Sequence, residues 1–197
     1  GYLRFAKMLK PLDVPVYCLP GNHDSPEIMQ EHLNDAPFQY CGQATMGSWQ
    51  LLMLNTHAYN DDSGQLQQEE LDKLDADLTA CAKQHAAIFL HHHPVPMGSR
   101  WLDGTGLRQH REFLNIVTSH KHVRTVVWGH VHQDSDHEHE HIRMLSTPST
   151  CSQFLPNSDD FAIDDRPPAY RWLNLYADGA IDTQVVWLEP AEYLNTP

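Results

Sequence analysis

The sequence predicts an α/β fold. Short apolar segments that suit buried strands alternate with segments whose apolar residues recur at helical spacing. Three of the apolar segments, residues 14–19, 86–90 and 124–128, are closely followed by asparagine or histidine. Because sites in open α/β sheets form at the carboxyl ends of strands, the same segments predict where a site lies.

Helical periodicity predicts four helices. The first covers residues 1–10 and ends at Pro11. The second begins at Ser25-Pro26-Glu27, with proline in its first turn. The third and clearest covers residues 66–83, and the fourth covers residues 107–118. The core face of the third helix consists of Leu71, Leu74, Leu78 and Cys81.

Strands are predicted along the whole chain. Besides the three named above, they cover residues 49–55, 142–146, 170–176 and 181–187. Asp178-Gly179 predicts a hairpin turn between the last two. Residues 156–168 are polar and rich in Pro and Asp, and we expect a long loop without regular structure there.

The composition is that of one globular domain over residues 1–197, with 41% hydrophobic and 20% charged residues. No apolar stretch approaches the roughly 20 residues of a membrane span, so no membrane partner is expected. The formal charge of −13 opposes binding to a nucleic-acid polymer. The cysteines form no C-x-x-C pair, which favours reduced core thiols and a cytoplasmic location. They are Cys18, Cys41, Cys81 and Cys151.

The tetrapeptide Gly21-Asn22-His23-Asp24 is the first candidate site. Asn offers a neutral oxygen ligand, His a general acid or a cation, and Asp a group that orients the His. The alternative is a plain turn with a capping Asp. We favour the site, because two other histidine motifs also follow predicted strands.

Those motifs are His91-His92-His93-Pro94 and Gly129-His130-Val131-His132. Three consecutive histidines cannot all point the same way, so we expect His92 to be the ligand and its neighbours to line the pocket. His130 and His132 stand two apart and can converge on adjacent ions in a tight turn. Imidazole suits Zn, Fe and Mn. Isolated surface histidines are the alternative explanation.

Several nearby residues are candidates for substrate contact. Arg100, or Arg108, can meet a phosphate oxygen, and Trp101 and Phe154 can stack on a nucleobase. A surface ion pair and ordinary core aromatics are the alternatives. The alternating His137-Glu138-His139-Glu140-His141 is either an adventitious metal site or, as we expect, a solvated hairpin.

In this order, the three motifs resemble the last three of five blocks that define the calcineurin-like metallophosphoesterase superfamily: D-x-H, G-D, G-N-H-D/E, a His after a strand, and G-H-x-H. Residues 91–96, 99–103 and 147–154 are also similar to its bacterial Icc/CpdA type. The resemblance covers essentially the whole chain. It implies a metallophosphoesterase-type α-β-β-α sandwich of two mixed sheets.

The first two blocks are absent, since residues 1–20 contain neither Asp-x-His nor Gly-Asp. The periodic pattern is also already under way at Gly1, with no Met and no N-cap. We therefore expect an N-terminally truncated domain, the remainder of a longer protein.

The resemblance also implies roles for the candidate residues. Asn22, His92 and His130 would bind one metal, while His132 would be the remaining ligand of the other. His23, oriented by Asp24, would protonate the leaving group. From their own chemistry and position, we expect His93, Arg100, Trp101 and Phe154 to contact the substrate. The full-length enzyme would hold two divalent ions (Mn, Fe or Zn), and this chain at most one firmly.

The activity that the resemblance implies is hydrolysis of 3′,5′-cyclic nucleotides, cyclic AMP in particular, by two-metal in-line attack. One alternative is another small phosphodiester, such as a glycerophosphodiester. The other is a non-catalytic metal-binding or oligomerising fragment, since missing strands would expose a sheet edge and favour a homo-dimer. We expect the chain alone to be inactive or nearly so.

Overall fold

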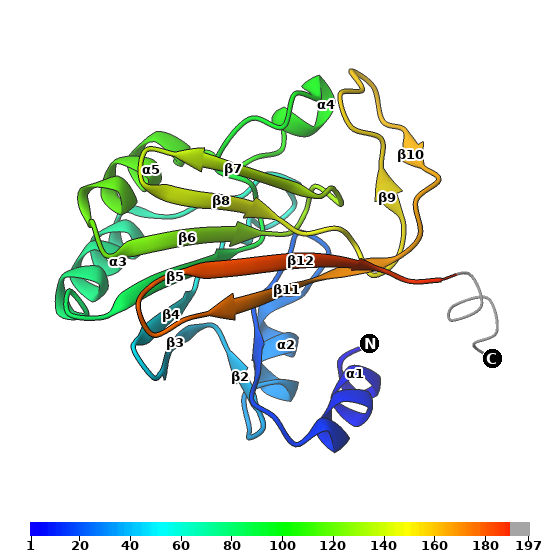
Figure 1. Cartoon of the computed structure of the whole chain (residues 1–197). Coiled ribbons are helices and arrows are strands. Elements are labelled where there is room, and N and C mark those ends of the chain that lie inside the picture. Colours follow the sequence, from blue (N-terminus) through cyan, green and yellow to red (C-terminus); the bar gives the residue numbers. More distant parts are fainter. Residues whose placement is uncertain (190–197) are drawn as a thin grey trace.

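The computed structural model describes residues 1–189 and confirms the α/β prediction (Figure 1). The last part of the predicted domain, residues 190–197, lies outside the described residues. The main feature of the described chain is a six-stranded sheet with the order β3-β4-β5-β6-β8-β7. Its strands are β3 (Gly42–Met46), β4 (Trp49–Met53), β5 (His85–Leu90), β6 (Val123–Trp128), β7 (Ser135–His139) and β8 (Ile142–Ser146).

This sheet is mixed. Strands β4, β5, β6 and β8 run parallel, and β3 and β7 pair antiparallel at the two edges. The carboxyl ends of β5 and β6 therefore meet at the same end of the sheet, as the sequence predicts. Strands β7 and β8 form a hairpin, as expected for residues 137–141. Glu138 and its neighbours on β7 are exposed to solvent.

Two helices, α3 (Gln68–Ala80) and α5 (His110–Ser119), cover one face of the sheet. The predicted core face of α3 is confirmed, because all four of its apolar residues are buried. They pack with Phe113 and Val117 of α5 against Ile88 and Val126 of the sheet. Every one of these side chains is excluded from water, which is the main source of stability for this layer.

The opposite face carries two separate two-stranded ladders within the described residues. Strands β1 (Val16–Cys18) and β2 (Phe38–Tyr40) pair parallel, and β11 (Ala169–Leu175) and β12 (Ile181–Trp187) form an antiparallel hairpin. The second layer is therefore two ladders and not one continuous sheet. The apolar cluster between the layers contains Trp49, Leu51, Met53, Tyr17, Leu19, Leu175 and Ile181.

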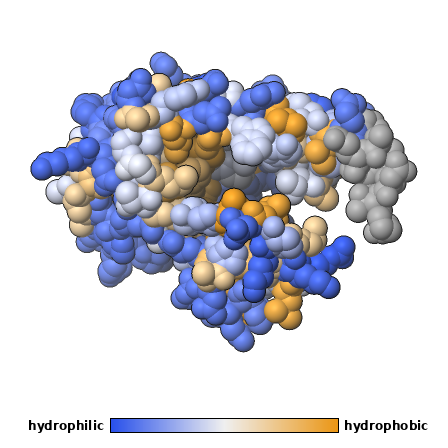
Figure 2. Space-filling view, turned by 60° about the horizontal axis from the view of Figure 1, so that its bottom comes forward, coloured by the Kyte–Doolittle hydropathy of each residue, from blue (hydrophilic) through white to orange (hydrophobic). Residues whose placement is uncertain are grey.

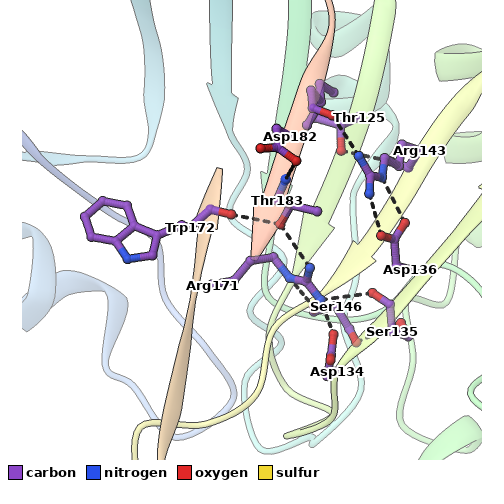
Figure 3. A network of polar contacts seen from close by, with 11 residues as sticks. Thr125, Asp134, Ser135, Asp136, Arg143, Ser146, Arg171, Trp172, Asp182 and Thr183 are labelled. Carbon is purple, nitrogen blue, oxygen red and sulfur yellow. Dashed lines mark hydrogen bonds and ion pairs between the residues drawn. The ribbon is translucent and has the colours of Figure 1, made fainter. Parts of the chain in front are cut away.

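A polar network fixes the β11–β12 hairpin on the sheet (Figure 3). The guanidinium of Arg171 donates to the Ser146 carbonyl at 2.9 Å and to Thr183 Oγ1 at 3.0 Å, and it pairs with Asp134. Arg143 donates to the Ile181 carbonyl at 2.8 Å. The hairpin is thus tied to β8 and to the loop that follows β6.

A smaller lobe contains α1 (Tyr2–Leu9), the 3₁₀ turn η1 (Lys10–Leu12) and α2 (Pro26–His32), which lie below the main sheet in Figure 1. Tyr2, Ala6 and Leu9 of α1 contact a cluster that includes Met29 and Phe38. Viewed from below, hydrophobic side chains gather around a hollowed part of the surface (Figure 2).

Five short elements were not predicted: β2, β3, α4 (Arg100–Asp103), β9 (Gln153–Phe154) and β10 (Ile163–Asp164). Strand β10 lies inside the stretch predicted as an irregular loop, and it forms there because Ile163 and Asp164 pair with β9. The prediction for residues 156–168 is wrong at that pair of residues.

The sequence predicts reduced cysteines in the core and no membrane-spanning segment, and the structure bears on both predictions. Within residues 1–189 all four cysteines are unpaired. Cys18 and Cys81 are buried, but Cys151 is exposed and Cys41 is partly exposed, so the core-residue prediction is wrong for these two. None of the helices described is long and apolar enough to cross a bilayer.

Candidate metal centre

Three turns meet at the carboxyl ends of their strands: residues 21–24 after β1, residues 91–93 after β5 and residues 129–132 after β6. They bring together His91, His92 and His130, each of which offers a ring nitrogen, and these atoms all lie within 4.8 Å of one another. Residues from distant parts of the sequence thus form one cluster, which we call the histidine cluster.

Asn22 completes this arrangement. Its Oδ1 lies 3.0 Å from His91 Nε2 and 3.3 Å from His130 Nδ1. Sequence reasoning did not include His91 among the candidate ligands and chose His92 from this run of histidines. Its position directly after β5 gives no signal by itself, because a run of three histidines does not reveal which ring turns toward the site.

Burial sets the protonation of the cluster. Exclusion from water lowers the pKa of His91, His92 and His130 to about 3, and the mutual repulsion of the charged rings lowers it further. These imidazoles are therefore neutral at pH 7. Neutral imidazole has the free lone pair that a metal ion requires.

Hydroxyl groups orient two of the rings. His92 Nδ1 lies 2.8 Å from Thr56 Oγ1, and His130 Nε2 lies 3.0 Å from Thr105 Oγ1. Among the residues described, His92 Nε2 is buried with no hydrogen-bond partner. A buried, unpartnered nitrogen among neutral donors fits a bound cation, because ligand histidines commonly fix one nitrogen and present the other.

Two glycines make room for the rings. A Cβ on Gly21 would lie 2.6 Å from His91 Cε1, and a Cβ on Gly64 would lie 2.5 Å from His92 Cγ. Both distances are far below van der Waals contact. The backbone can approach the cluster this closely only without side chains at these positions.

The loop after β6 has a strained backbone. His130 has a φ of 62° and His132 a φ of 47°, in the left-handed region that few non-glycine residues adopt. His132 Nδ1 donates to the Ser152 carbonyl at 2.8 Å, and its ring stacks on Phe154 at 4.1 Å. His132 lies outside the three-histidine group. Its Nε2 is left with a lone pair.

His23 and Asp24 occupy different surroundings. His23 is exposed, and its Nε2 lies 3.5 Å from Asn22 Nδ2. Asp24 accepts hydrogen bonds from the Gly21 amide and the Tyr2 hydroxyl, both at 2.8 Å. No hydrogen bond joins Asp24 to His23 in the described chain. Asp24 was expected to orient His23, but in the structure its oxygens accept hydrogen bonds that stabilise the turn and α1.

Two of the predicted substrate residues, His93 and Arg100, lie in different surroundings. His93 is buried and stacks on His130 with ring centroids 5.7 Å apart, and burial lowers its pKa to about 4 despite the nearby Asp103. Arg100 is largely exposed and pairs with Asp159 at 3.6 Å, which is the surface ion pair considered as its alternative. His93 therefore belongs to the wall of the centre.

Trp101 and Phe154 lie together. Their ring centroids are 5.2 Å apart, and both contact Phe161, which is 61% exposed. The stack of His132 on Phe154 joins this aromatic group to the loop after β6. A cleft of about 290 Å³ opens on that loop. It is lined by Gly129, His130, His132, Thr147, Pro148, Ser149, Thr150, Ala169 and Tyr170.

Comparisons with known proteins identify the family to which the chain belongs. In sequence, the chain is 36% identical over 194 residues to the 3′,5′-cyclic adenosine monophosphate phosphodiesterase CpdA of Haemophilus influenzae, covering 98% of this chain and 71% of that protein. It is 40% identical over 195 residues to the protein of the same name from Vibrio vulnificus, again covering 98% and 71%.

In structure, the chain is similar to a dimetal phosphatase from Danio rerio, with a TM-score of 0.65 and 15% identity over 92% of this chain and 74% of that one. At this identity the likeness supports the fold. The model of the family described as calcineurin-like phosphoesterase matches residues 1–134, which include all three strand-end turns. The chain therefore belongs to the calcineurin-like phosphoesterase family, whose members hydrolyse phosphoesters with divalent metal ions.

Proposed function

We propose that this chain forms the metal-binding part of a phosphodiesterase that hydrolyses 3′,5′-cyclic AMP. The observation that carries the proposal is the grouping of Asn22 with the histidine cluster at the strand ends. The substrate is supported by the names of relatives that are 36–40% identical and that this chain matches over 71% of their length.

The proposed ligands of one ion are Asn22 Oδ1 and ring nitrogens of the histidine cluster, His91, His92 and His130. Mixed nitrogen and oxygen donors suit Mn, Fe or Zn. A bound divalent ion activates water and neutralises charge on the phosphoryl oxygens. His132, whose Nε2 is unprotonated, is the proposed ligand of a second ion.

His23 is the proposed general acid. It is exposed beside Asn22, at the rim of the centre, where a substrate oxygen can reach it. When the P–O3′ bond breaks, the imidazolium gives its proton to the 3′ oxygen, which leaves as a hydroxyl group. Positioned acids of this kind contribute about 10²–10⁴ in rate.

The aromatic group of Trp101 and Phe154 is the proposed contact for the nucleobase; the stack of Phe154 on His132, the proposed ligand of the second ion, supports this. His93 and Arg100 remain proposed contacts for the substrate. A base that stacks on aromatic rings gains roughly 1–3 kcal/mol. The proposed partners are the small phosphodiester and a second copy of this chain.

The chain alone is proposed to hold one ion firmly and to be inactive or nearly so. Within residues 1–189, the histidine cluster is the only group of three or more His, Cys, Asp or Glu side chains close enough to share an ion. A cytoplasmic location is proposed as well, in keeping with the four unpaired cysteines.

The test assays two Mn²⁺-loaded proteins: this chain, and the same chain joined at Gly1 to the segment of a relative that carries the Asp-x-His and Gly-Asp blocks. Each is given cyclic AMP, glycerophosphocholine and bis(p-nitrophenyl) phosphate. We expect the joined protein to hydrolyse cyclic AMP to 5′-AMP with a higher kcat/KM than it shows for glycerophosphocholine. The substitution His91→Ala should abolish the hydrolysis of cyclic AMP.

Hydrolysis of glycerophosphocholine without hydrolysis of cyclic AMP would show that the substrate is a glycerophosphodiester and not a cyclic nucleotide. No hydrolysis by either protein would favour the non-catalytic alternative. Equal, measurable rates for the two proteins would refute the proposal that this chain alone is inactive or nearly so.

A further inference from the structure

The side-chain amide of Asn22 has two ends of nearly equal shape but opposite chemistry. Its oxygen can bind a cation, while its amino group carries two hydrogens and cannot. A rotation of the amide by half a turn exchanges the two ends with little change in volume. An asparagine ligand therefore needs a neighbour that distinguishes them.

The structure shows what faces each end. Oδ1 faces His91 and His130 of the histidine cluster, at 3.0 Å and 3.3 Å. On the other side, Nδ2 donates to Asp62 Oδ1 at 3.2 Å. His23 Nε2 lies 3.5 Å from Nδ2, at the limit of a hydrogen bond. Of these four groups, Asp62 alone is an obligate acceptor.

We propose that Asp62 is a positioning residue that holds the Asn22 amide with its oxygen toward the metal ion. The inference rests on the proposed function, since it takes Asn22 as a ligand. In the reversed orientation the carbonyl of Asn22 would face the carboxylate of Asp62, and two partial negative charges would meet. The amino group would then point at the cation.

The loop that carries Asp62 is anchored on both sides. Asp61 accepts from the Ser63 amide at 2.7 Å and pairs with Arg108. The Gly64 amide donates to the Gly106 carbonyl at 3.1 Å. Asp62 itself is exposed and lies outside the group of side chains close enough to share an ion. Its side chain contacts the centre through Asn22, while its backbone, through a hydrogen bond, opposes the lowering of the His92 pKa by burial.

The test measures Co²⁺ affinity at pH 7 by visible absorption, for the unmodified chain and for variants. Loss of a group that orients a metal ligand commonly costs about 10–100-fold in affinity. We expect Asp62→Ala to weaken Co²⁺ binding by about that factor. Asp62→Asn places a second amide there, which can turn either of its ends toward Asn22 and so no longer fixes the orientation; it should weaken Co²⁺ binding about as much as Asp62→Ala. The control, Asp35→Asn, removes the same charge from an exposed residue in the loop before β2 and should have little effect.

A second background separates orientation from charge attraction. In Asn22→Asp both oxygens of the side chain can bind the ion, so orientation no longer matters. There, Asp62→Ala should leave Co²⁺ affinity unchanged or raise it, because two adjacent carboxylates repel.

Unchanged affinity in Asp62→Ala or in Asp62→Asn would overturn the inference, and so would a loss that persists in the Asn22→Asp background. If the unmodified chain binds no Co²⁺, the proposed metal centre itself fails. That outcome is distinct, because it appears before any variant is compared.

Discussion

At the scale of single residues, the metal centre depends on small neighbours that leave space for buried imidazole rings. Gly64 is the clearest case, because its backbone lies against the ring of His92, which has no exposed surface. The ring cannot move aside without disturbing its contact with Thr56.

Replacing Gly64 with alanine should therefore destabilise the protein. Overpacking of this kind costs about 1–3 kcal/mol. We also expect weaker Co²⁺ binding, since the ring of His92 must shift. Urea unfolding of Gly64→Ala measures the first effect. Gly129→Ala is the control, because its Cβ would meet His91 at an ordinary 3.5 Å. Equal stability of Gly64→Ala and the unmodified protein would contradict the prediction.

The buried histidines also predict how stability depends on pH in the metal-free protein. Burial holds the pKa of His91, His92 and His130 at about 3 in the folded chain, whereas an unfolded histidine titrates near 6.5. Between these values the unfolded state binds more protons, so the free energy of unfolding falls as the pH is lowered from 6.5. Each group contributes a slope of up to about 1.4 kcal/mol per pH unit.

The measurement is urea unfolding in the presence of a chelator at pH 7.5, 6 and 5. His110→Gln removes an exposed histidine and should leave the slope unchanged. A free energy of unfolding that stays constant over this range would show that the rings are not held neutral by the fold.

Sequence reasoning identified Asn22, His92 and His130, because each follows an apolar run that predicts a strand. It missed His91, because a run of three histidines does not reveal how the backbone turns after β5. It also missed Asp62, whose importance comes from a contact 40 residues away along the chain. Such contacts have no periodic signal in a single sequence.

At the scale of elements, the β11–β12 hairpin is held by charged groups as well as by its apolar face. Arg171 is the centre of this network, and its side chain is 5% exposed (Figure 3). It joins three separate segments through Asp134, Ser146 and Thr183. Asp134 is two residues from His132, so the network also steadies the loop of the metal centre.

We expect Arg171→Met to lower the free energy of unfolding by about 2–3 kcal/mol, because hydrogen bonds to a charged group are lost and buried acceptors remain. Urea unfolding gives the value. Arg100→Met is the matched control, since its side chain is 73% exposed and a surface pair contributes less than about 1 kcal/mol. Losses of the same size in both variants would contradict a special role for Arg171.

The long elements were predictable and the short ones were not. Helix α3 and strands β5, β6, β8 and β12 have enough residues to show a period, and their positions agree with the prediction. Strand β2 has three residues and β9 has two, so no period can form. Their pairing depends on where the rest of the chain folds, which tertiary contacts decide.

At the scale of the whole molecule, the second layer leaves strand edges open. Within residues 1–189, β1 pairs with β2 alone and β11 with β12 alone. A cleft of about 900 Å³ borders β11, and Trp172 on that strand is 57% exposed. Unpaired edges beside apolar surface favour association with another strand.

We therefore expect this chain to form a homo-dimer through the edge of β11. Light scattering over a range of concentrations should show a shift from monomer to dimer. Trp172→Glu should weaken the dimer by placing a charge at the edge, while Leu3→Glu, on exposed α1, should not. A monomer at every concentration would contradict this prediction.

The left-handed backbone at His130 and His132 has a consequence for how the centre can evolve. Among residues other than glycine, Asn, Asp and His accept such a backbone most readily. In a library of substitutions at these two positions, the variants that keep the loop folded would mostly carry Asn or Asp. Both of these side chains have oxygen atoms that can bind a metal ion. Oxygen favours harder cations such as Mg²⁺ and Mn²⁺, whereas imidazole favours Zn²⁺. The shape of this loop therefore directs its most accessible mutations toward a change of metal preference.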